Sequence, residues 1–185
     1  LKKLNKTFDG NLILNNISTK FTQGKTNLII GQSGSGKTVL LKCLLGLHIP
    51  DDGEILYDGI SNKEMTENQK TLLRREMGMV FQGSALFDSM TVLENVMFPL
   101  KMLTQKDESE IYEKAENAIR RVELDNAQQK LPSELSGGMQ KRVAIARAIV
   151  MNPKYLFCDE PNSGLDPKTA IIIDNLIQEI TKEYN

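Results

Sequence analysis

A glycine-rich loop in the first quarter of the chain has the residue types that bind a row of phosphates. Residues 31–38 read GQSGSGKT and match the pattern G-x-x-x-x-G-K-[ST], between an apolar stretch and a predicted helix. Glycines let the backbone curl so that several N–H groups point at one anion. Lys37 adds positive charge at the β- and γ-phosphates, and the Thr38 hydroxyl can bind Mg²⁺. The pattern indicates a nucleoside triphosphate, as in kinases, GTPases and motor proteins. The candidate ligand-binding residues are Gly31, Ser33, Gly34, Ser35, Gly36, Lys37 and Thr38.

Two adjacent carboxylates follow a short apolar segment near the other end of the chain. Asp159 and Glu160 come directly after residues 155–158, which read YLFC. If this segment is a strand of a parallel sheet, its carboxyl end lies at the edge where ligands bind, beside the phosphate loop. Asp159 would then hold Mg²⁺ through water, and Glu160 would polarise the attacking water as a general base. Alternatively, the pair is only the solvated opening of a turn before Pro161.

A second anion-binding pattern lies between these two. Residues 135–142 read LSGGMQKR and continue into VAIARAI, which predicts a helix that begins at Gly137 with Ser136 as its capping hydroxyl. Small residues leave backbone N–H groups open at a helix start, and this suits a γ-phosphate. Either the helix folds back over the chain's own loop, or it covers a nucleotide bound by a second copy of the chain.

Strand and helix patterns alternate around these groups, and this predicts an α/β core with an inserted helical subdomain. From Thr91 to about Val150 the apolar period is helical, and strands are expected on either side of it. The expected strands are short ones within residues 1–21 around a turn at Asp9-Gly10, then 26–30, 54–57, 78–81 and 155–158, followed by a helix from about Asp166. One helix face is expected to carry Ile111, Ala115, Ala118, Ile119 and Val122.

Composition sets broader limits. The chain has 185 residues, of which 40% are hydrophobic, and a formal net charge of −1, so it can form one ordinary domain and has no strong field to attract nucleic acid or an anionic membrane. No apolar run reaches the length of roughly 18 residues that a membrane span needs. Cys43 and Cys158 lie in apolar runs and are predicted to be small buried hydrophobes in a reducing cytosol. Because the chain begins at Leu1 rather than Met, we expect it to be a fragment at its N-terminus.

The order of these motifs resembles that of the ATP-binding cassette (ABC) ATPases. It runs from the phosphate loop through Gln82 to LSGGM at 135–139, FCDEP at 157–161 and SGLD at 163–166. The LSGG pattern with its following helix is specific to this superfamily, and the resemblance covers essentially the whole chain. It implies a P-loop NTPase core with N-terminal antiparallel strands and an inserted α-helical subdomain. The division implied is a core of about 1–85 and 151–185 and a helical subdomain of about 86–150.

The resemblance also implies how ATP and Mg²⁺ are handled. The phosphate loop corresponds to the Walker A motif, Asp159 to the end of the Walker B motif, and Glu160 to the catalytic glutamate. Gln82 resembles the Q-loop glutamine, which touches Mg²⁺ and the attacking water and senses the membrane partner. The implied catalytic residues are Glu160, Gln82 and Lys37, and the implied metal ligands are Thr38, Gln82 and Asp159.

The remaining motifs imply a second copy of the chain. Ser136, Gly137 and Gly138 resemble the signature motif, which covers ATP held by the opposite subunit, so two chains would sandwich two ATP molecules head to tail. Residues 163–166 resemble the D-loop, which links the two sites across the dimer. Phe8 lies where the family places an aromatic ring that stacks on adenine, although it could equally belong to the core.

One departure from the family pattern concerns the switch histidine, which the family places beyond the catalytic glutamate after one more strand. The sole histidine, His48, lies between a predicted helix and strand and is interpreted as an ordinary loop residue. The sequence ends at Asn185, before the switch position. We therefore expect a truncation at the C-terminus and poor ATP hydrolysis by these 185 residues alone.

Two features favour a transporter subunit over other ABC ATPases. The interval from Lys37 to Ser136 has no long heptad run, unlike the chromosome-maintenance and double-strand-break ATPases. There is one cassette and no arginine-rich linker, unlike the ribosome-acting subfamily. The expected partner is therefore a transmembrane permease. The alternative is a non-transport ABC ATPase that acts on the ribosome or on DNA.

Residues 81–100 (FQGSALFDSMTVLENVMFPL), and Met139 where most of the family has Gln, are similar to the ATPase of Mla-type lipid transport systems. These systems work with a permease and a substrate-binding protein of the mammalian-cell-entry (MCE) class. The resemblance implies phospholipid transport at the cytoplasmic face of the inner membrane, without a nucleic-acid partner. Alternatively, the segment is a groove for the permease of another importer or exporter. Its apolar side chains are Ala85, Leu86, Phe87, Val92, Leu93, Val96 and Phe98.

Overall fold

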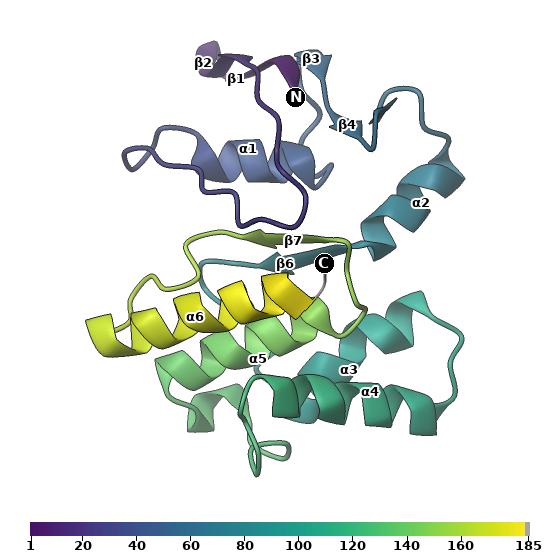
Figure 1. The fold of residues 1–185 in the computed structure, drawn as a ribbon, viewed down its shortest axis with the longest axis vertical. Coiled ribbons are helices and arrows are strands. Elements are labelled where there is room, and N and C mark those ends of the chain that lie inside the picture. The colour runs from purple at the N-terminus through teal and green to yellow at the C-terminus, as the bar shows by residue number, and fades with distance from the viewer. Residues whose placement is uncertain (184–185) are drawn as a thin grey trace. The chain divides into compact units, whose positions relative to one another are not determined.

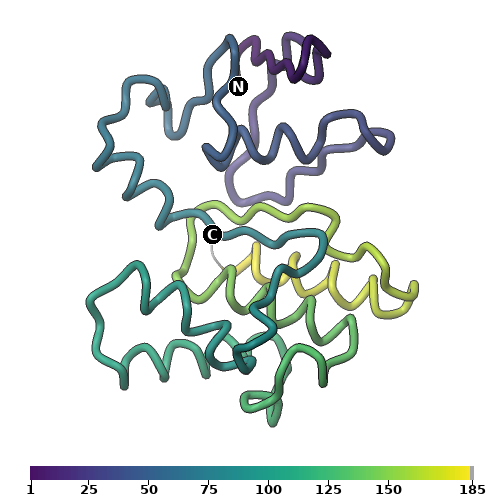
Figure 2. Tube along the Cα trace, turned by 180° about the vertical axis from the view of Figure 1, so that it is seen from behind, coloured from purple at the N-terminus to yellow at the C-terminus, as the bar shows by residue number. Residues whose placement is uncertain are grey.

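The computed structural model describes residues 1–183 of the chain (Figures 1 and 2). The chain forms two compact units that divide between Arg74 and Arg75. No helix of the described residues has both the length and the apolar character needed to cross a membrane. The phosphate loop belongs to the first unit, whereas Gln82, the LSGGM segment and the acidic pair belong to the second.

The first unit is built on a β-hairpin. Strands β1 (Lys2–Phe8) and β2 (Asn11–Ile17) are antiparallel and pair up to the residues that flank the turn. The turn residues Asp9 and Gly10 have positive φ values of 49° and 79°, as the common two-residue hairpin turn requires. The expected antiparallel strands at the N-terminus, with a turn at Asp9-Gly10, are therefore confirmed.

Short elements complete the first unit. Strand β3 (Asp52–Glu54) pairs with β1 to give the order β2-β1-β3, and β4 (Leu56–Tyr57) forms a separate antiparallel pair with β5 (Ile60–Ser61). Helix α1 (Lys37–Leu44) follows the phosphate loop, and its buried face packs against strand β2 of the hairpin. Helix α2 (Glu67–Arg75) buries none of its residues. The buried side chains of α1 are Leu40, Leu41, Cys43 and Leu44.

The strand expected at residues 26–30 is wrong. This segment has no strand pairing, and the side chains of Leu28 and Ile30 are 79% and 85% exposed. An apolar segment becomes a strand only where a neighbouring strand supplies ladder hydrogen bonds. The sequence of the segment does not show whether such a neighbour is present. The described strands of the first unit pair among themselves and none of them pairs with this segment.

A parallel pair of strands forms the sheet of the second unit. Strand β6 (Met77–Val80) runs beside β7 (Tyr155–Cys158), with Val80 opposite Cys158. Parallel neighbours require a long crossover connection, and here a helical region supplies it. The strands expected at 78–81 and 155–158 are confirmed within a residue at each end.

Helices make up the rest of the second unit. Helix α5 lies centrally: it packs against β6 on one side and against α3 and α4 on the other, with α6 alongside it (Figure 1). The expected helical stretch from Thr91 to about Val150 is confirmed. The elements are α3 (Val92–Leu103), α4 (Glu108–Arg121), a 3₁₀ helix (Pro132–Glu134), α5 (Gly137–Ile149) and α6 (Pro167–Glu183).

The core of the second unit gathers on the central helix. Most of α5 is buried, and the apolar face expected on α4 is buried against it. Burial also raises the pKa of the Cys158 thiol to about 12, so this cysteine is a neutral apolar side chain rather than a nucleophile. The buried α4 face is the one expected: Ile111, Ala115, Ala118, Ile119 and Val122.

Candidate functional site

The phosphate loop is crowded at two of its glycines, and at Gly36 the backbone conformation itself favours glycine. Gly36 has a φ of 91°, and a Cβ added there would lie 3.1 Å from Ile13. A Cβ added at Gly31 would lie 2.4 Å from the Ser35 Oγ, closer than real contacts allow. Gly34 also has a positive φ, of 79°. The loop is therefore a tight curl with an exposed rim, as an anion cradle requires.

Lys37 crosses this curl. Its ammonium donates hydrogen bonds to the carbonyl oxygens of Gly31, at 3.0 Å, and Gln32, at 3.1 Å. Helix α1 begins at Lys37, its N-cap Gly36 supplies no side-chain hydrogen bond, and its first turn has no acidic residue. The helix dipole and the lysine therefore favour a negative group at this end, with the Thr38 side chain exposed beside it.

The second unit brings Gln82 and Glu160 together. The parallel register that sets Val80 opposite Cys158 puts both residues two positions beyond the paired strands, at the same edge of the sheet. The Gln82 side-chain amide donates to a Glu160 carboxylate oxygen across 2.9 Å. Both side chains are exposed, so the pair lies where a water or a substrate can reach it.

Asp159 lies just inside this edge. Its backbone N–H donates to the Val80 carbonyl at 2.9 Å and so extends the strand pairing by one residue. Its side chain is buried, whereas the next residue, Glu160, turns outward with a φ of 46°. A non-glycine residue with positive φ is uncommon, and here it separates an inward carboxylate from an outward one. The two carboxylates therefore have different surroundings, which suits two different roles.

The LSGGM segment starts helix α5 as expected. Ser136 is its N-cap, and the Ser136 hydroxyl oxygen accepts a hydrogen bond from the Met139 N–H at 3.3 Å. A Cβ added at Gly138 would lie 2.7 Å from Thr169 Cγ2, whereas one at Gly137 would meet Leu165 at an ordinary 3.6 Å. The close approach of α6 therefore leaves little room for a side chain at position 138.

The SGLD segment leads into the start of α6. The Asp166 carboxylate accepts backbone hydrogen bonds from Lys168 and Thr169, each at 3.1 Å. The hydrogen bonds from Thr169 hold the pKa of Asp166 below its ordinary value. Asn162, before this segment, donates its side-chain amide to both carboxylate oxygens of Asp174 on α6, at 3.2 Å. Both ends of the segment are thus tied to the same helix.

Phe8 lies at the end of β1 with 37% of its surface exposed. Its ring contacts the His48 ring with centroids 5.2 Å apart and planes at 68°, and the Lys6 ammonium lies 5.0 Å from its centroid. His48 is in a loop, as expected, but its contact with Phe8 was not predicted. An exposed aromatic ring next to a cation could receive a flat base, and its role in binding adenine stays a prediction.

Three side chains that the sequence analysis did not single out hold the segment after Gln82. Lys141 and Arg147 of α5 and Asn95 of α3 donate to backbone carbonyls of residues 82–87. Arg147 was detectable from sequence, because it interrupts the apolar run VAIARAIV. Nothing local to Lys141 or Asn95 indicates such a contact, since it depends on tertiary packing.

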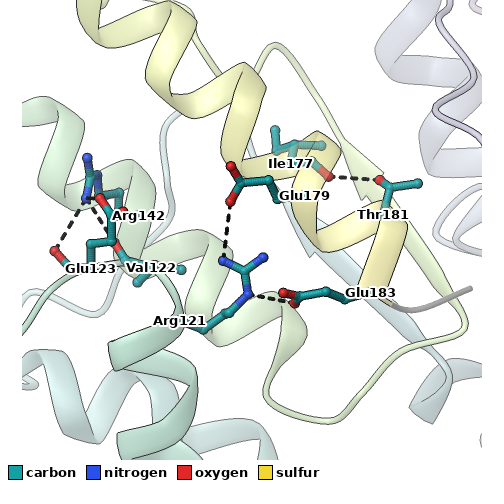
Figure 3. Close-up of polar contacts among 8 residues, drawn as sticks. All are labelled: Arg121, Val122, Glu123, Arg142, Ile177, Glu179, Thr181 and Glu183. Atoms are coloured by element: carbon teal, nitrogen blue, oxygen red, sulfur yellow. Dashed lines mark hydrogen bonds and ion pairs between the residues drawn. The ribbon is translucent and has the colours of Figure 1, made fainter.

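Arginines also join the helices away from this edge (Figure 3). Arg121, at the end of α4, lies 2.6 Å from the carboxylate of Glu183 and 3.7 Å from that of Glu179, both on α6. Arg142 of α5 forms a 3.0 Å ion pair with Glu123. These exposed pairs connect the helices without touching Gln82 or the acidic pair.

Comparison with known proteins agrees with the geometry. A family model described as "ABC transporter" matches residues 14–163. The methionine import ATP-binding protein MetN of Clostridium tetani is 43% identical over 183 residues, which is 99% of this chain and 57% of that protein. The probable ribonucleotide transport ATP-binding protein mkl of Mycobacterium leprae is 39% identical over 185 residues, which is 100% of this chain and 53% of that protein. This chain thus spans a little over half the length of these two relatives.

A solved structure is similar in fold. It is a dimeric post-hydrolysis state of the ATP-binding cassette MJ0796 bound to ADP and Pi, with a TM-score of 0.86 and 33% sequence identity. The similarity covers 98% of this chain and 82% of that one. The expected fold class, a P-loop core with N-terminal antiparallel strands and a helical subdomain, is therefore confirmed.

Proposed function

This chain belongs to the ABC transporter family, and from that premise we propose that it binds and hydrolyses ATP to drive a membrane transporter. The observation that carries the proposal is the 2.9 Å hydrogen bond from Gln82 to Glu160 at the carboxyl ends of two parallel strands. This bond fixes the direction of an exposed carboxylate that can take a proton from water. We also propose the division into a core of about 1–85 and 151–185 and a helical subdomain of about 86–150.

The donor set fits ATP and Mg²⁺. The curl at Gly31 and Gly36 excludes side chains from the phosphate cradle, and Lys37 brings positive charge to it. Thr38, Gln82 and Asp159 are the oxygen donors that would hold Mg²⁺, which prefers such ligands and neutralises charge on the phosphates. Phe8 would stack on adenine, and the exposed Ser33 and Ser35 line the loop's rim.

Glu160 is the proposed general base. Its carboxylate accepts a proton as water attacks the γ-phosphorus, the bond to the β-phosphate oxygen breaks, and ADP leaves. Gln82 fixes the direction of this carboxylate by donating a hydrogen bond to it. Asp159 remains a carboxylate that serves the metal rather than the water. This assignment matches the inward and outward turns of the two side chains.

The signature helix supports pairing of two copies. Ser136 and Gly137 are exposed at the start of α5, where the first N–H groups of a helix have no intrahelical partner. We propose that they cover the γ-phosphate of ATP bound by a second copy, head to tail. The solved cassette dimer with ADP and Pi is a relative of the same fold that does pair.

The proposed permease site is a hollow of about 280 Å³ in the second unit. Phe81, Phe87 and Leu103 on its rim are 37%, 40% and 39% exposed, and the Phe87 and Phe98 rings pack with centroids 4.6 Å apart. Exposed aromatic rings around a hollow suit the apolar face of a docked helix. The expectation that Val92, Leu93 and Val96 also face the partner is wrong, since they lie in the core at 8% exposure or less. They are the inward positions of an amphipathic helix.

The cargo is the finer part of the proposal. The similarity of residues 81–100 and Met139 to Mla-type ATPases favours phospholipid, with a permease and an MCE-class protein as partners at the cytoplasmic face of the inner membrane. The relative that is 43% identical carries methionine import in its name and favours an amino-acid importer instead. Cargo does not contact an ATPase subunit, so the choice between them rests on resemblance and not on a binding site for the cargo.

The test is recovery of the full-length protein from detergent-solubilised native membranes, with proteins and lipids identified by mass spectrometry. A permease with an MCE-class protein and enriched phospholipid is the expected result. A permease with an amino-acid-binding protein would keep the transporter and overturn the lipid cargo. Ribosomes or DNA without any membrane protein would overturn the transporter itself. The Glu160→Gln variant is recovered in parallel, because it should accumulate as a nucleotide-bound dimer. Partners that are enriched with this variant bind the nucleotide-bound dimer, and partners recovered equally with both proteins do not depend on it.

A further inference from the structure

The backbone carbonyls of the segment from Gln82 to Phe87 accept hydrogen bonds from side chains of neighbouring helices. Lys141 donates to the Gln82 carbonyl, and Arg147 donates to the carbonyls of Ser84, at 2.8 Å, and Ala85, at 2.7 Å. We propose that Lys141 and Arg147 are positioning residues that fix Gln82 against Glu160, so that helix α5 sets the geometry of the chain's own catalytic pair. This inference rests on the proposed ATPase function.

Lys141 is an unusual anchor. It is only 5% exposed, and burial lowers the pKa of its ammonium. Among the described residues, no carboxylate forms an ion pair with it, and its ammonium donates to the Gln82 carbonyl oxygen. An ammonium buried against a backbone carbonyl costs stability unless its hydrogen bonds are well placed. A purely structural position would be filled more stably by an apolar residue, as at its buried neighbours Val143 and Ala144.

The backbone of this segment is strained, so it needs hydrogen bonds from neighbouring side chains to hold its conformation. Ser84 and Ala85 have φ values of 61° and 48° in the left-handed region that favours glycine. Such residues persist only where surrounding contacts hold them. Arg147 donates to both of their carbonyls, and its guanidinium lies 5.9 Å from the centroid of the Phe87 ring.

The far end of the segment is held by a different helix. Asn95 of α3 is fully buried, accepts from the Phe87 N–H at 2.9 Å and donates to the Phe87 carbonyl at 3.1 Å. Gln82 at the near end and the strained pair in the middle are both held by α5. A shift of α5 would therefore move Gln82 relative to Glu160 while Phe87 stays with α3.

The same helix begins with the signature motif. Ser136 caps α5, and Lys141 follows little more than one helical turn later, so the helix start and the Gln82 anchor are parts of one rigid element. Contact of a partner's ATP with the helix start would thus be transmitted to Gln82 through a single hydrogen bond. This connects the two half-sites of each chain by a defined route.

The test compares the full-length protein with Lys141→Met, Lys141→Arg and Gln82→Ala, singly and combined. Lys141→Met keeps the stem and removes the donor, so kcat should fall about 10- to 100-fold, as for a misplaced catalytic group, while the Kd for fluorescent ATP changes less than about twofold. Lys141→Arg keeps a donor and should recover most of the rate. In the Gln82→Ala background, Lys141→Met should cost less than about twofold more, because the side chain that it positions is gone.

Full, multiplicative losses in the double variant would overturn the proposal, as would a kcat for Lys141→Met equal to that of the unaltered protein. If Lys141→Met does not fold, Arg147→Lys, which loses one of two carbonyl bonds, takes its place with the same expected non-additivity. Arg121→Met is the matched control, because it removes an arginine whose ion pairs join α4 to Glu179 and Glu183 of α6 (Figure 3), and it should leave kcat within about twofold. Absence of ATP hydrolysis by the unaltered protein would instead overturn the proposed function.

Discussion

Two helices of this chain have glycines at their starts, and these starts are completed differently. Helix α1 follows Gly36, which supplies no side-chain acceptor to its first turn. Helix α5 follows Ser136, whose hydroxyl accepts from the Met139 N–H. The first start also carries Lys37, whereas the second has no charged residue in its first turn.

This difference in capping indicates two different roles in phosphate binding, which the glycine patterns alone do not distinguish. A helix start without a side-chain cap gains most from an anion that accepts its first-turn N–H groups, and a lysine there strengthens the attraction. A start already capped by its own serine gains less, so it can add contacts to an anion that is held elsewhere. We infer that α1 is the primary phosphate site and α5 the completing one.

The largest effect is expected from removing the base, since neither helix start can replace it. Glu160→Gln keeps the hydrogen bond geometry with Gln82 and loses the proton acceptor, so turnover should fall about 10²- to 10⁴-fold. ATP binding at α1 should survive, and a nucleotide-bound dimer should accumulate. Phosphate release and size-exclusion chromatography with MgATP measure the two effects. The experiment should include the permease, and monomer under every condition would contradict the composite site.

The two helix starts can be separated by Lys37→Ala and Ser136→Arg. Lys37→Ala should abolish ATP binding by the chain that carries it. Ser136→Arg blocks only the start that covers the partner's ATP, so turnover should fall about 10²- to 10³-fold while binding of fluorescent ATP by a monomer is kept. Equal loss of binding in the two variants would remove the distinction between a primary and a completing start.

The sequence predicted the groups that depend on local patterns. The cap at Ser136, the turn at Asp9-Gly10 and the phosphate curl each follow from a few adjacent residues, and the structure has all three. The position of Glu160 at the end of a strand also follows from its sequence, whereas the role of Gln82 was implied only by the family resemblance. Local chemistry and alternation are enough for these features.

Features that depend on distant partners were not predicted. Residues 26–30 look like a strand by composition, but a strand is defined by its neighbour, and none of the described strands pairs with it. The hydrogen bond from Lys141 to Gln82 joins residues 59 positions apart, so no local sequence pattern around either residue could predict it. Val92 and Leu93 were assigned to a partner surface because an apolar residue looks the same whether it faces a core or a partner.

The start of helix α5 is expected to tolerate an added methyl group at one of its two glycines better than at the other. Gly138→Ala puts a Cβ 2.7 Å from Thr169 Cγ2, so it should lower the free energy of unfolding by about 1–3 kcal/mol despite the better helix propensity of alanine. Gly137→Ala is the control, since its nearest contact is 3.6 Å, and it should be neutral or stabilising. Thr169→Ser removes the clashing carbon and should rescue Gly138→Ala. Urea unfolding measures all three, and equal losses at both glycines would refute the packing argument.

The smallest effect is expected at the start of α6, the helix whose Thr169 crowds Gly138. Hydrogen bonds from Thr169 lower the pKa of Asp166, so the charged carboxylate stabilises the fold above its unfolded pKa of about 3.9, and this contribution is lost as the pH falls through the lower folded pKa. Asp166→Asn keeps an acceptor that does not titrate. The unaltered protein should therefore melt slightly higher than the variant at pH 7, and the gap should close below about pH 4. Melting curves from pH 3 to 7 test this, and a gap that stays constant would mean that Asp166 acts by shape rather than by charge.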